Sequence, residues 1–260
     1  DYPALGFVGE KPVSYREVYK KINQIIPLLE RQGIEPGDKV AILSSNQPNW
    51  GITYFALASM GVTIVPLLPD FSDSEIENIL RHSESKALFV SEGLYRKVVN
   101  CSSENLNLTV LIDNFSLIPQ GTSEKGLSTL STSLVENDFS SKNYTVFTDD
   151  VASIIYTSGT TGKSKGVMLT HKNLIFCAIG SGKIHSMDTT DSMLSVLPLS
   201  HTYENTLGLI LPMMYGTSVN YLKKPPVPSV LMPALKIVRP TLMLTVPLIM
   251  EKVYRGKVLH

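Results

Sequence analysis

Short apolar runs with the composition of β-strands alternate with amphipathic helical segments along most of this sequence. The segments 39–43, 62–67, 86–91 and 109–113 are mostly apolar, whereas apolar residues recur at helical spacing from Val18 to Leu29. Further helices are predicted at 46–60, 72–81 and 93–100. Strands that are apolar nearly throughout are typical of parallel sheets with helices on both faces. The sequence therefore predicts an α/β fold with mostly parallel sheets covered on both faces.

A change in composition divides the chain. From residue 114 to 149 the sequence is rich in Ser, Thr, Asn and Gly, with few apolar anchors. This stretch predicts a loop-rich connection with a short helix near 130–136. We therefore expect a first α/β subdomain at 1–148 and the start of a second at 149–260. In the second, we expect strands at 151–156, 191–197, 218–222 and 241–246 and helices at 172–179, 206–215, 227–238 and from 247 onward.

The charge balance and the cysteine content exclude several classes of protein. The 23 basic residues equal the 23 acidic ones, so nothing in the charge favours a nucleic-acid partner. Cys101 and Cys177 are far apart, which favours neither a disulfide framework nor a thiolate metal site. No apolar run reaches membrane-spanning length. These features predict a cytoplasmic globular protein.

The most informative loop in the sequence runs from Tyr156 to Gly166. It follows the apolar run 151–156 and consists almost wholly of Gly, Ser, Thr and Lys. Glycines allow close approach of a ligand to the main chain, and successive N–H groups can converge on an anion. Lys163 and Lys165 add positive charge. The pattern predicts a site for a polyphosphate; the alternative is a solubilising surface loop without a ligand.

A P-loop is the first nucleotide-binding motif to compare with this loop. Gly162, Lys163 and Ser164 fit the end of that motif, but Thr157 stands where its first glycine is required. A P-loop also continues directly into a helix, whereas the apolar residues at 167–169 predict extended chain. A P-loop NTPase is therefore kept only as an alternative.

Four segments of the chain resemble the AMP-binding, adenylate-forming superfamily. They are the phosphate loop 157–166, the strand–helix motif 13–18, the segment 61–69 and the block 197–204. Within the superfamily, the sequences of these four segments most resemble those of long-chain fatty acid–CoA ligases. The loop departs from the family at Ser164, where proline is usual, and this should loosen the loop slightly.

The resemblance implies a two-step reaction, in which ATP activates a long-chain fatty acid to acyl-AMP and coenzyme A then takes the acyl group. It assigns the phosphates of ATP to Thr157, Ser158, Gly159, Thr160, Thr161, Gly162, Lys163, Lys165 and Gly166. Thr160 is the expected Mg²⁺ contact, and Thr160 and Lys165 are the expected catalytic residues. His201 and Tyr203 are expected beside the acyl carboxylate, and His171 is expected to orient the loop.

Fatty acid, ATP and coenzyme A are thus the implied ligands, and a lipid substrate implies peripheral contact with a membrane. The family places its adenine-binding Tyr-Gly-x-Thr-Glu block, hinge and C-terminal lysine further along than residue 260. We therefore expect this chain to be an N-terminal fragment without ligase activity of its own.

Alternatives remain within and outside the family. An acyl–carrier-protein ligase or an aryl or medium-chain acid–CoA ligase would share the same motifs. A P-loop NTPase would hydrolyse ATP unaided, and a non-catalytic interaction module would not respond to ATP–Mg²⁺ at all.

Overall fold

The computed structural model describes residues 1–101, 103–136, 138–140, 142–157 and 164–257. The chain forms two compact units, and neither is a single run of sequence. Unit 1 comprises Asp1–Val18, Asn46–Gly51 and Ile175–His260, and unit 2 comprises Tyr19–Ser45 and Ile52–Leu174. The expected division at residue 148 stays a prediction.

Unit 2 is built on a seven-stranded sheet with the order β7-β6-β5-β3-β4-β8-β9. Its strands are β3 (Lys39–Leu43), β4 (Thr63–Leu67), β5 (Ala87–Val90), β6 (Leu108–Leu111), β7 (Ser116–Leu117), β8 (Val151–Thr157) and β9 (Lys165–Thr170). The inner pairs are parallel, whereas the edge pairs β6–β7 and β8–β9 are antiparallel. This confirms the predicted, mostly parallel sheet.

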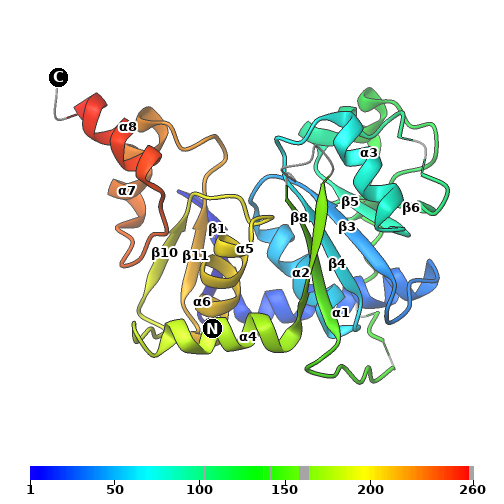
Figure 1. The fold of residues 1–260 in the computed structure, drawn as a ribbon, viewed down its shortest axis with the longest axis horizontal. Coiled ribbons are helices and arrows are strands. Elements are labelled where there is room, and N and C mark those ends of the chain that lie inside the picture. The colour runs from blue at the N-terminus through cyan, green and yellow to red at the C-terminus, as the bar shows by residue number, and fades with distance from the viewer. Residues whose placement is uncertain (102, 137, 141, 158–163, 258–260) are drawn as a thin grey trace. The chain divides into compact units, whose positions relative to one another are not determined.

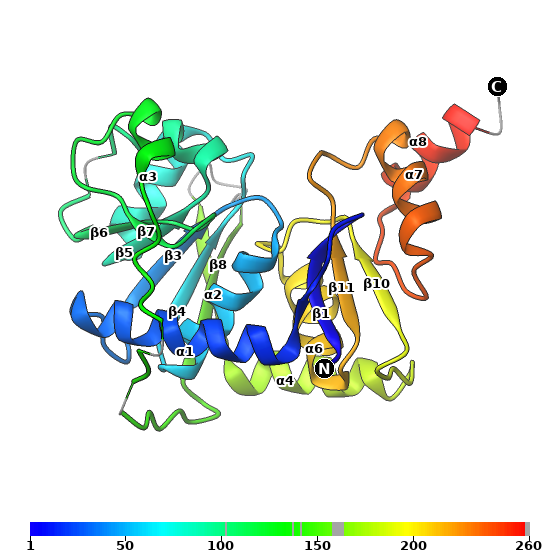
Figure 2. The ribbon, with the colours of Figure 1, turned by 180° about the vertical axis from the view of Figure 1, so that it is seen from behind.

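Helices cover both faces of this sheet. They are α1 (Tyr15–Arg31), α2 (Pro48–Ser59) and α3 (Asp73–His82), together with the 3₁₀ helices η1 (Glu92–Lys97) and η2 (Glu124–Thr129). The chain passes from β3 to β4 in one direction and from β4 to β5 in the other. Because such crossovers are right-handed, α2 and α3 must lie on opposite faces. Figures 1 and 2 show α3 on one face and α2 on the other.

The core of unit 2 follows from the apolar strands. Leu43, Val65 and Leu88 pack against Ile76 and Leu80 of α3. Helix α3 begins with a capping box, in which the Ser72 side chain accepts from the Glu75 N–H and the Glu75 carboxylate accepts from the Ser72 N–H. The predicted start of this helix is confirmed.

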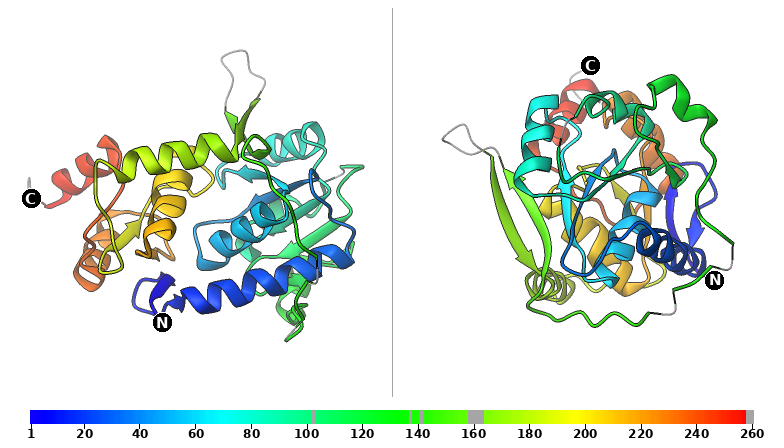
Figure 3. Two further views of the ribbon diagram at one scale, coloured as in Figure 1. Left: turned by 90° about the horizontal axis from the view of Figure 1, so that it is seen from below. Right: turned by 90° about the vertical axis from the view of Figure 1, so that its right-hand side faces the viewer.

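Strands β8 and β9 form an antiparallel hairpin that extends beyond its neighbours (Figure 3). The hairpin is joined to β4 near its base. There the buried Ser153 hydroxyl donates to the Ile64 carbonyl oxygen at 3.1 Å, and the Thr63 hydroxyl donates to the Val151 carbonyl oxygen at 2.9 Å. These bonds fix the hairpin at the end opposite its loop.

Unit 1 contains a four-stranded sheet with the order β10-β11-β1-β2. Its strands are β1 (Pro3–Phe7), β2 (Val13–Ser14), β10 (Ser192–Ser195) and β11 (Ser218–Tyr221). The later helices of the chain are α4 (His171–Gly182), α5 (Thr202–Glu204), the π-helix η3 (Asn205–Ile210), α6 (Leu211–Tyr215), α7 (Pro228–Val238) and α8 (Pro247–Lys257).

Alternate residues of β10 face two different helical layers. Leu194 packs against Leu231 and Ala234 of α7, whereas the next residue, Ser195, bonds Glu204 of α5. Successive side chains of a strand point to opposite faces, so α7 and α5 cover opposite faces of this sheet. Figures 1 and 2 agree in placing α5 and α6 on one side of β1 and β11.

Several predicted elements are wrong or incomplete. Residues 130–136 are not helical, and the nearby helix is η2. Residues 241–246 form no strand, because only Leu242 makes a bridge, to Met193. The helix expected at 93–100 is a 3₁₀ helix ending at Lys97, and that expected at 206–215 starts as a π-helix. Strand β1 was not predicted.

Within the described residues, no helix combines the length and apolarity needed to cross a bilayer.

Candidate functional site

The phosphate loop joins the two strands of the β8–β9 hairpin. Thr157 pairs with Lys165, and Tyr156 pairs with Gly166, so the antiparallel ladder reaches both ends of the loop. Of the predicted phosphate-binding residues, only Thr157, Lys165 and Gly166 are described. The others lie outside the described residues: Ser158, Gly159, Thr160, Thr161, Gly162 and Lys163.

The residue types at the ends of the loop fit an anion site. Thr157 and Lys165 are both exposed, at facing positions of the ladder. Lys165 makes no salt bridge with any residue in the described part of the chain. Its ammonium group is therefore available to a ligand. Because strand β9, rather than a helix, follows the loop, the P-loop alternative is wrong.

A close contact holds the hairpin below the loop. A Cβ atom on Gly166 would lie 2.8 Å from Ile154 Cγ2 and 3.2 Å from Tyr156 Cζ, so only glycine fits there without a shift. The buried Tyr156 in turn bonds His82 on the last turn of α3, with 2.7 Å between the hydroxyl oxygen and Nδ1. Burial raises the pKa of Tyr156. Sequence reasoning assigned no role to His82, and no local motif marks it.

His171 lies at the other end of the hairpin. It is the first residue of α4, and its N–H donates to the Asp150 carbonyl oxygen at 3.1 Å. Burial lowers its pKa. His171 follows Thr170, at the end of the hairpin opposite the loop. Its expected role in orienting the loop stays a prediction, because most of the loop lies outside the described residues.

The second predicted group of residues lies in unit 1, on the turn that contains α5. His201 is the N-cap of α5, and its Nδ1 accepts from the Tyr203 N–H at 3.3 Å. Both side chains are exposed, Tyr203 by 41%. The structure thus brings the two expected substrate residues together on one turn, with both side chains exposed.

The Asn46 side chain forms hydrogen bonds to residues 195–199, the segment that leads into this turn. Its Nδ2 donates to the Leu197 carbonyl oxygen at 2.6 Å and to the Ser195 hydroxyl at 3.0 Å, while its Oδ1 accepts from the Leu199 N–H at 2.9 Å. These three bonds fix the path of 195–199, directly before His201. No local sequence pattern marks this role of Asn46, since its partners are about 150 residues away.

Sequence reasoning also assigned no role to Glu204. It ends α5, is completely buried, and accepts from the Ser195 hydroxyl at 2.5 Å. Burial raises its pKa to about 8, although the bond from Ser195 acts in the opposite direction. Its position directly before the apolar run 206–215 was the signal that could have identified it as a buried acid.

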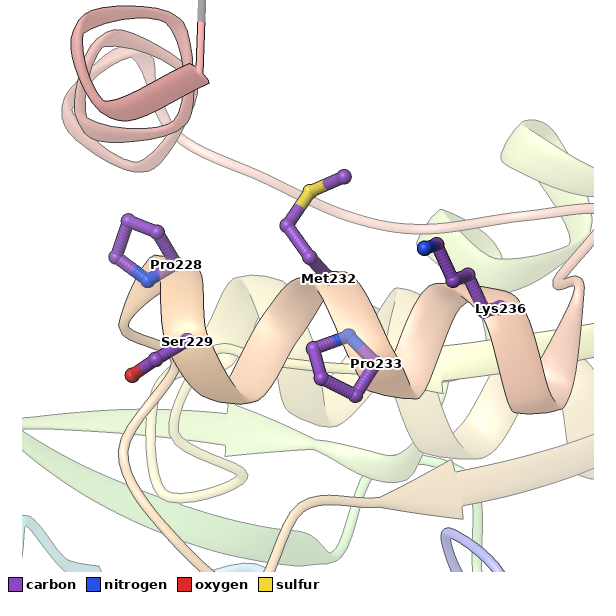
Figure 4. A pocket seen from close by; sticks show the side chains of 5 residues that line it. All are labelled: Pro228, Ser229, Met232, Pro233 and Lys236. Atoms are coloured by element: carbon purple, nitrogen blue, oxygen red, sulfur yellow. The ribbon is translucent and has the colours of Figure 1, made fainter. Parts of the chain in front are cut away.

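Neither the pocket on α7 nor a metal-binding cluster involves the predicted site residues that the structure describes. A shallow pocket on α7 is lined by Pro228, Ser229, Met232, Pro233 and Lys236 (Figure 4), and contains none of them. The described residues also contain no group of three or more His, Cys, Asp or Glu side chains that could hold a metal ion.

Comparison with known proteins places the chain among adenylate-forming ligases. A sequence profile described as AMP-binding enzyme matches residues 1–259. The peroxisomal long chain acyl-CoA synthetase 6 of Arabidopsis thaliana is 32% identical over 96% of this chain and 36% of its own length. A chloroplastic long-chain-fatty-acid–[acyl-carrier-protein] ligase of the same plant is 29% identical over 94% of this chain and 35% of its own. The chain thus spans little more than a third of these relatives.

Solved structures show the same fold. The o-succinylbenzoate coenzyme A synthetase of Bacillus subtilis, in complex with AMP, has a TM-score of 0.78 at 22% identity and covers 99% of this chain and 61% of its own. The N-terminal domain of FACL13 from Mycobacterium tuberculosis has a TM-score of 0.81 at 21% identity, covering 98% and 61%. The expected N-terminal α/β architecture of adenylate-forming enzymes is confirmed.

Proposed function

Because this chain belongs to the AMP-binding enzyme family, we propose that the whole protein that carries it activates long-chain fatty acids with ATP and transfers the acyl group to coenzyme A. The observation that carries the proposal is the family match over residues 1–259. The acid is proposed from relatives named as long chain acyl-CoA synthetases, which are 32% and 28% identical to the chain.

In the first step, a carboxylate oxygen of the fatty acid attacks the α-phosphorus of ATP, and the bond to pyrophosphate breaks. A carboxylate is already a nucleophile at neutral pH, so positioning and charge neutralisation matter more than a general base. We assign the β- and γ-phosphates to the loop 157–166. Lys165 neutralises charge on the leaving pyrophosphate, and its exposed ammonium group, which forms no salt bridge with the described residues, supports this role.

Mg²⁺ is proposed to arrive as part of the ATP complex. The described residues offer no carboxylate or histidine cluster for a resident metal. The Thr160 hydroxyl, which lies outside the described residues, is the proposed protein contact to this ion.

His201 and Tyr203 are proposed to hold the carboxylate end of the acid. Both are exposed on one turn, and their bond at 3.3 Å joins a backbone N–H to an imidazole nitrogen and so leaves the Tyr203 hydroxyl and His201 Nε2 for the ligand. In the second step, the thiolate of coenzyme A attacks the acyl carbon and AMP leaves. No described residue is assigned to the thiol. A cytoplasmic location with peripheral membrane contact is proposed from the lipid character of the substrate.

An acyl carrier protein is the second candidate acceptor. The 29% identity to the long-chain-fatty-acid–[acyl-carrier-protein] ligase supports it. Both acceptors present the same phosphopantetheine thiol, so the first step is common to the two functions and only the second distinguishes them.

The test measures acid-dependent pyrophosphate release and thioester formation by the whole protein, with ATP–Mg²⁺ and palmitate, octanoate or benzoate. Coenzyme A and holo acyl carrier protein are supplied in separate reactions. We expect palmitate to be the best acid and Lys165→Ala to lower pyrophosphate release roughly 10²-fold or more, as for loss of a group that stabilises transition-state charge.

Lys172→Ala is the matched control, because Lys172 is an exposed lysine on the first turn of α4, just after the end of the hairpin opposite the loop, with its Nζ 3.7 Å from Asp149 Oδ1. Its activity should equal that of the wild type. Phosphate release from ATP without any acid, or equal rates in Lys165→Ala and the wild type, contradicts the proposal.

A further inference from the structure

A buried acid lies directly beside the proposed substrate turn. Glu204 is 0% exposed, whereas Tyr203, the residue before it, is 41% exposed. The turn therefore presents its ligand-binding side chains outward and its carboxyl group inward. The following residues, Asn205–Ile210, form a π-helix, a local geometry that occurs frequently at functional sites.

The Glu204 carboxyl group is held in place from several sides. Its Oε1 accepts from the Ser195 hydroxyl at 2.5 Å, and Ser195 in turn accepts from Asn46 Nδ2 at 3.0 Å. A Cβ atom on Gly208 would lie 2.7 Å from the carboxyl carbon, so the π-helix backbone packs directly against this group. The side chain thus links α5 to the end of β10.

No lysine, arginine or histidine among the described residues forms a salt bridge with this acid. The titratable groups around it are Tyr221 on β11, whose buried hydroxyl has no hydrogen-bond partner among the described residues, and Tyr15 beside Tyr221. The exposed His201 lies three residues before it. Burial raises the pKa of Glu204 to about 8. Burial also raises the pKa of Tyr221, and the Glu204 carboxylate, when ionised, raises it further.

Other polar atoms in the same turn and helix are also buried and have no hydrogen-bond partner in the described part of the chain. They include Glu204 Oε2, both amide atoms of Asn205 and the Thr206 hydroxyl. An unpaired buried anion is far more costly than an unpaired neutral group. This environment therefore admits the neutral carboxylic acid and disfavours the carboxylate.

We propose that Glu204 is a positioning residue for binding of the acyl carboxylate: its neutral carboxyl group anchors the α5 turn to Ser195 and so holds His201 and Tyr203 in place. Ionisation places an unbalanced charge under the turn and displaces both side chains. The inference rests on the proposed function in assigning His201 and Tyr203 to the substrate, whereas the anchoring itself does not depend on that assignment.

The consequence for substrate binding is a pH dependence with a defined size. If only the neutral form binds the acid well, KM for palmitate should rise about tenfold between about pH 7 and about pH 9, with little change in kcat. Glu204→Gln keeps a neutral group of the same shape and should retain the low KM at both pH values. Glu204→Ala and Ser195→Ala should raise KM at both.

Two measurements test, without substrate, whether the neutral Glu204 carboxyl group anchors the α5 turn. The first is the infrared carbonyl band of a protonated carboxyl group, recorded for the chain between about pH 6 and about pH 9. We expect a band that Glu204→Gln removes and Glu251→Gln, a change of an exposed acid on α8, does not. The second is hydrogen exchange of the Asn205 N–H, which donates to the His201 carbonyl oxygen at 2.9 Å.

The protection factor of the Asn205 N–H, which removes the base-catalysed rise of exchange with pH, should fall in Glu204→Ala, and in the wild type above about pH 8, but not in Glu204→Gln. An absent infrared band at neutral pH, or a Glu204→Gln variant that behaves like Glu204→Ala, overturns the inference. If the wild type makes no acyl-AMP from any acid, the proposed function fails, while the infrared and exchange results still decide whether Glu204 anchors the turn. A variant too unstable to study does not remove the test, because the wild-type pH titration remains.

Discussion

Replacing Glu204 by Gln should change how the stability of the chain depends on pH. Burial raises the pKa of the carboxyl group to about 8 in the folded chain, against an ordinary value of 4.5. The folded state therefore holds a proton that the unfolded state releases between these two values. The stabilisation is complete below about pH 4.5 and is lost as the pH rises toward 8.

The size of the effect follows from the shift in pKa. One pKa unit corresponds to about 1.36 kcal/mol, so the shift of about 3.5 units, the difference between 8 and 4.5, sets a limit of about 5 kcal/mol. Between about pH 5.5 and about pH 7.5 the wild type should lose about 2.5 kcal/mol through this group. Glu204→Gln does not titrate and should lose none of that amount.

Trp50 provides the assay. It is the single tryptophan of the chain, it is fully buried, and it belongs to unit 1, as Glu204 does. Urea unfolding followed by tryptophan fluorescence at the two pH values therefore reports the unit that contains the acid. Glu251→Gln, which changes an exposed acid, should keep the wild-type pH dependence. Equal pH dependence in Glu204→Gln and the wild type would refute the reasoning that burial keeps this group protonated.

Three further predictions concern the residues that support the β8–β9 hairpin and the α5 turn. Asn46→Ala removes three hydrogen bonds of 2.6, 2.9 and 3.0 Å and should lower the free energy of unfolding by about 3 kcal/mol. Urea unfolding followed by Trp50 fluorescence measures this loss, and a change below the experimental error would contradict the anchoring of 195–199. Gly166→Ala should cost about 1–3 kcal/mol in circular-dichroism melts, because its Cβ meets Ile154 at 2.8 Å, whereas Gly93→Ala, with open space around it, should cost almost nothing. A double-mutant cycle of His82→Ala and Tyr156→Phe should give a coupling of about 1 kcal/mol for their 2.7 Å bond, and additive effects would show that the bond is absent.

Most of the fold could be predicted because its strands are buried on both faces. Strand β3 has the predicted bounds, and β4 and β5 are each shorter than predicted by only one or two residues, since their apolar runs end at turn residues. The segment 241–246 has an equally strong strand composition but makes only one bridge. Strand formation needs a partner strand, and composition does not specify whether one is available.

The site could be predicted in part for a similar reason. The loop after β8 and the residues His201 and Tyr203 are contiguous motifs, so their sequence carries the information. Asn46 acts on a segment about 150 residues further along, and His82 bonds a residue 74 positions away. Such contacts depend on how the chain folds, and no local pattern encodes them.

The central claim is that the loop between β8 and β9 holds the phosphates of ATP. The most direct test is calorimetric titration of ATP–Mg²⁺ into the whole protein that carries this chain, for the wild type, Lys163→Ala, Lys165→Ala and the control Lys172→Ala. The account predicts a charge-assisted contact of about 1.5–3 kcal/mol from each loop lysine, so each loop variant should bind roughly 10- to 100-fold more weakly while the control is unchanged. Wild-type affinity in both loop variants would contradict the account.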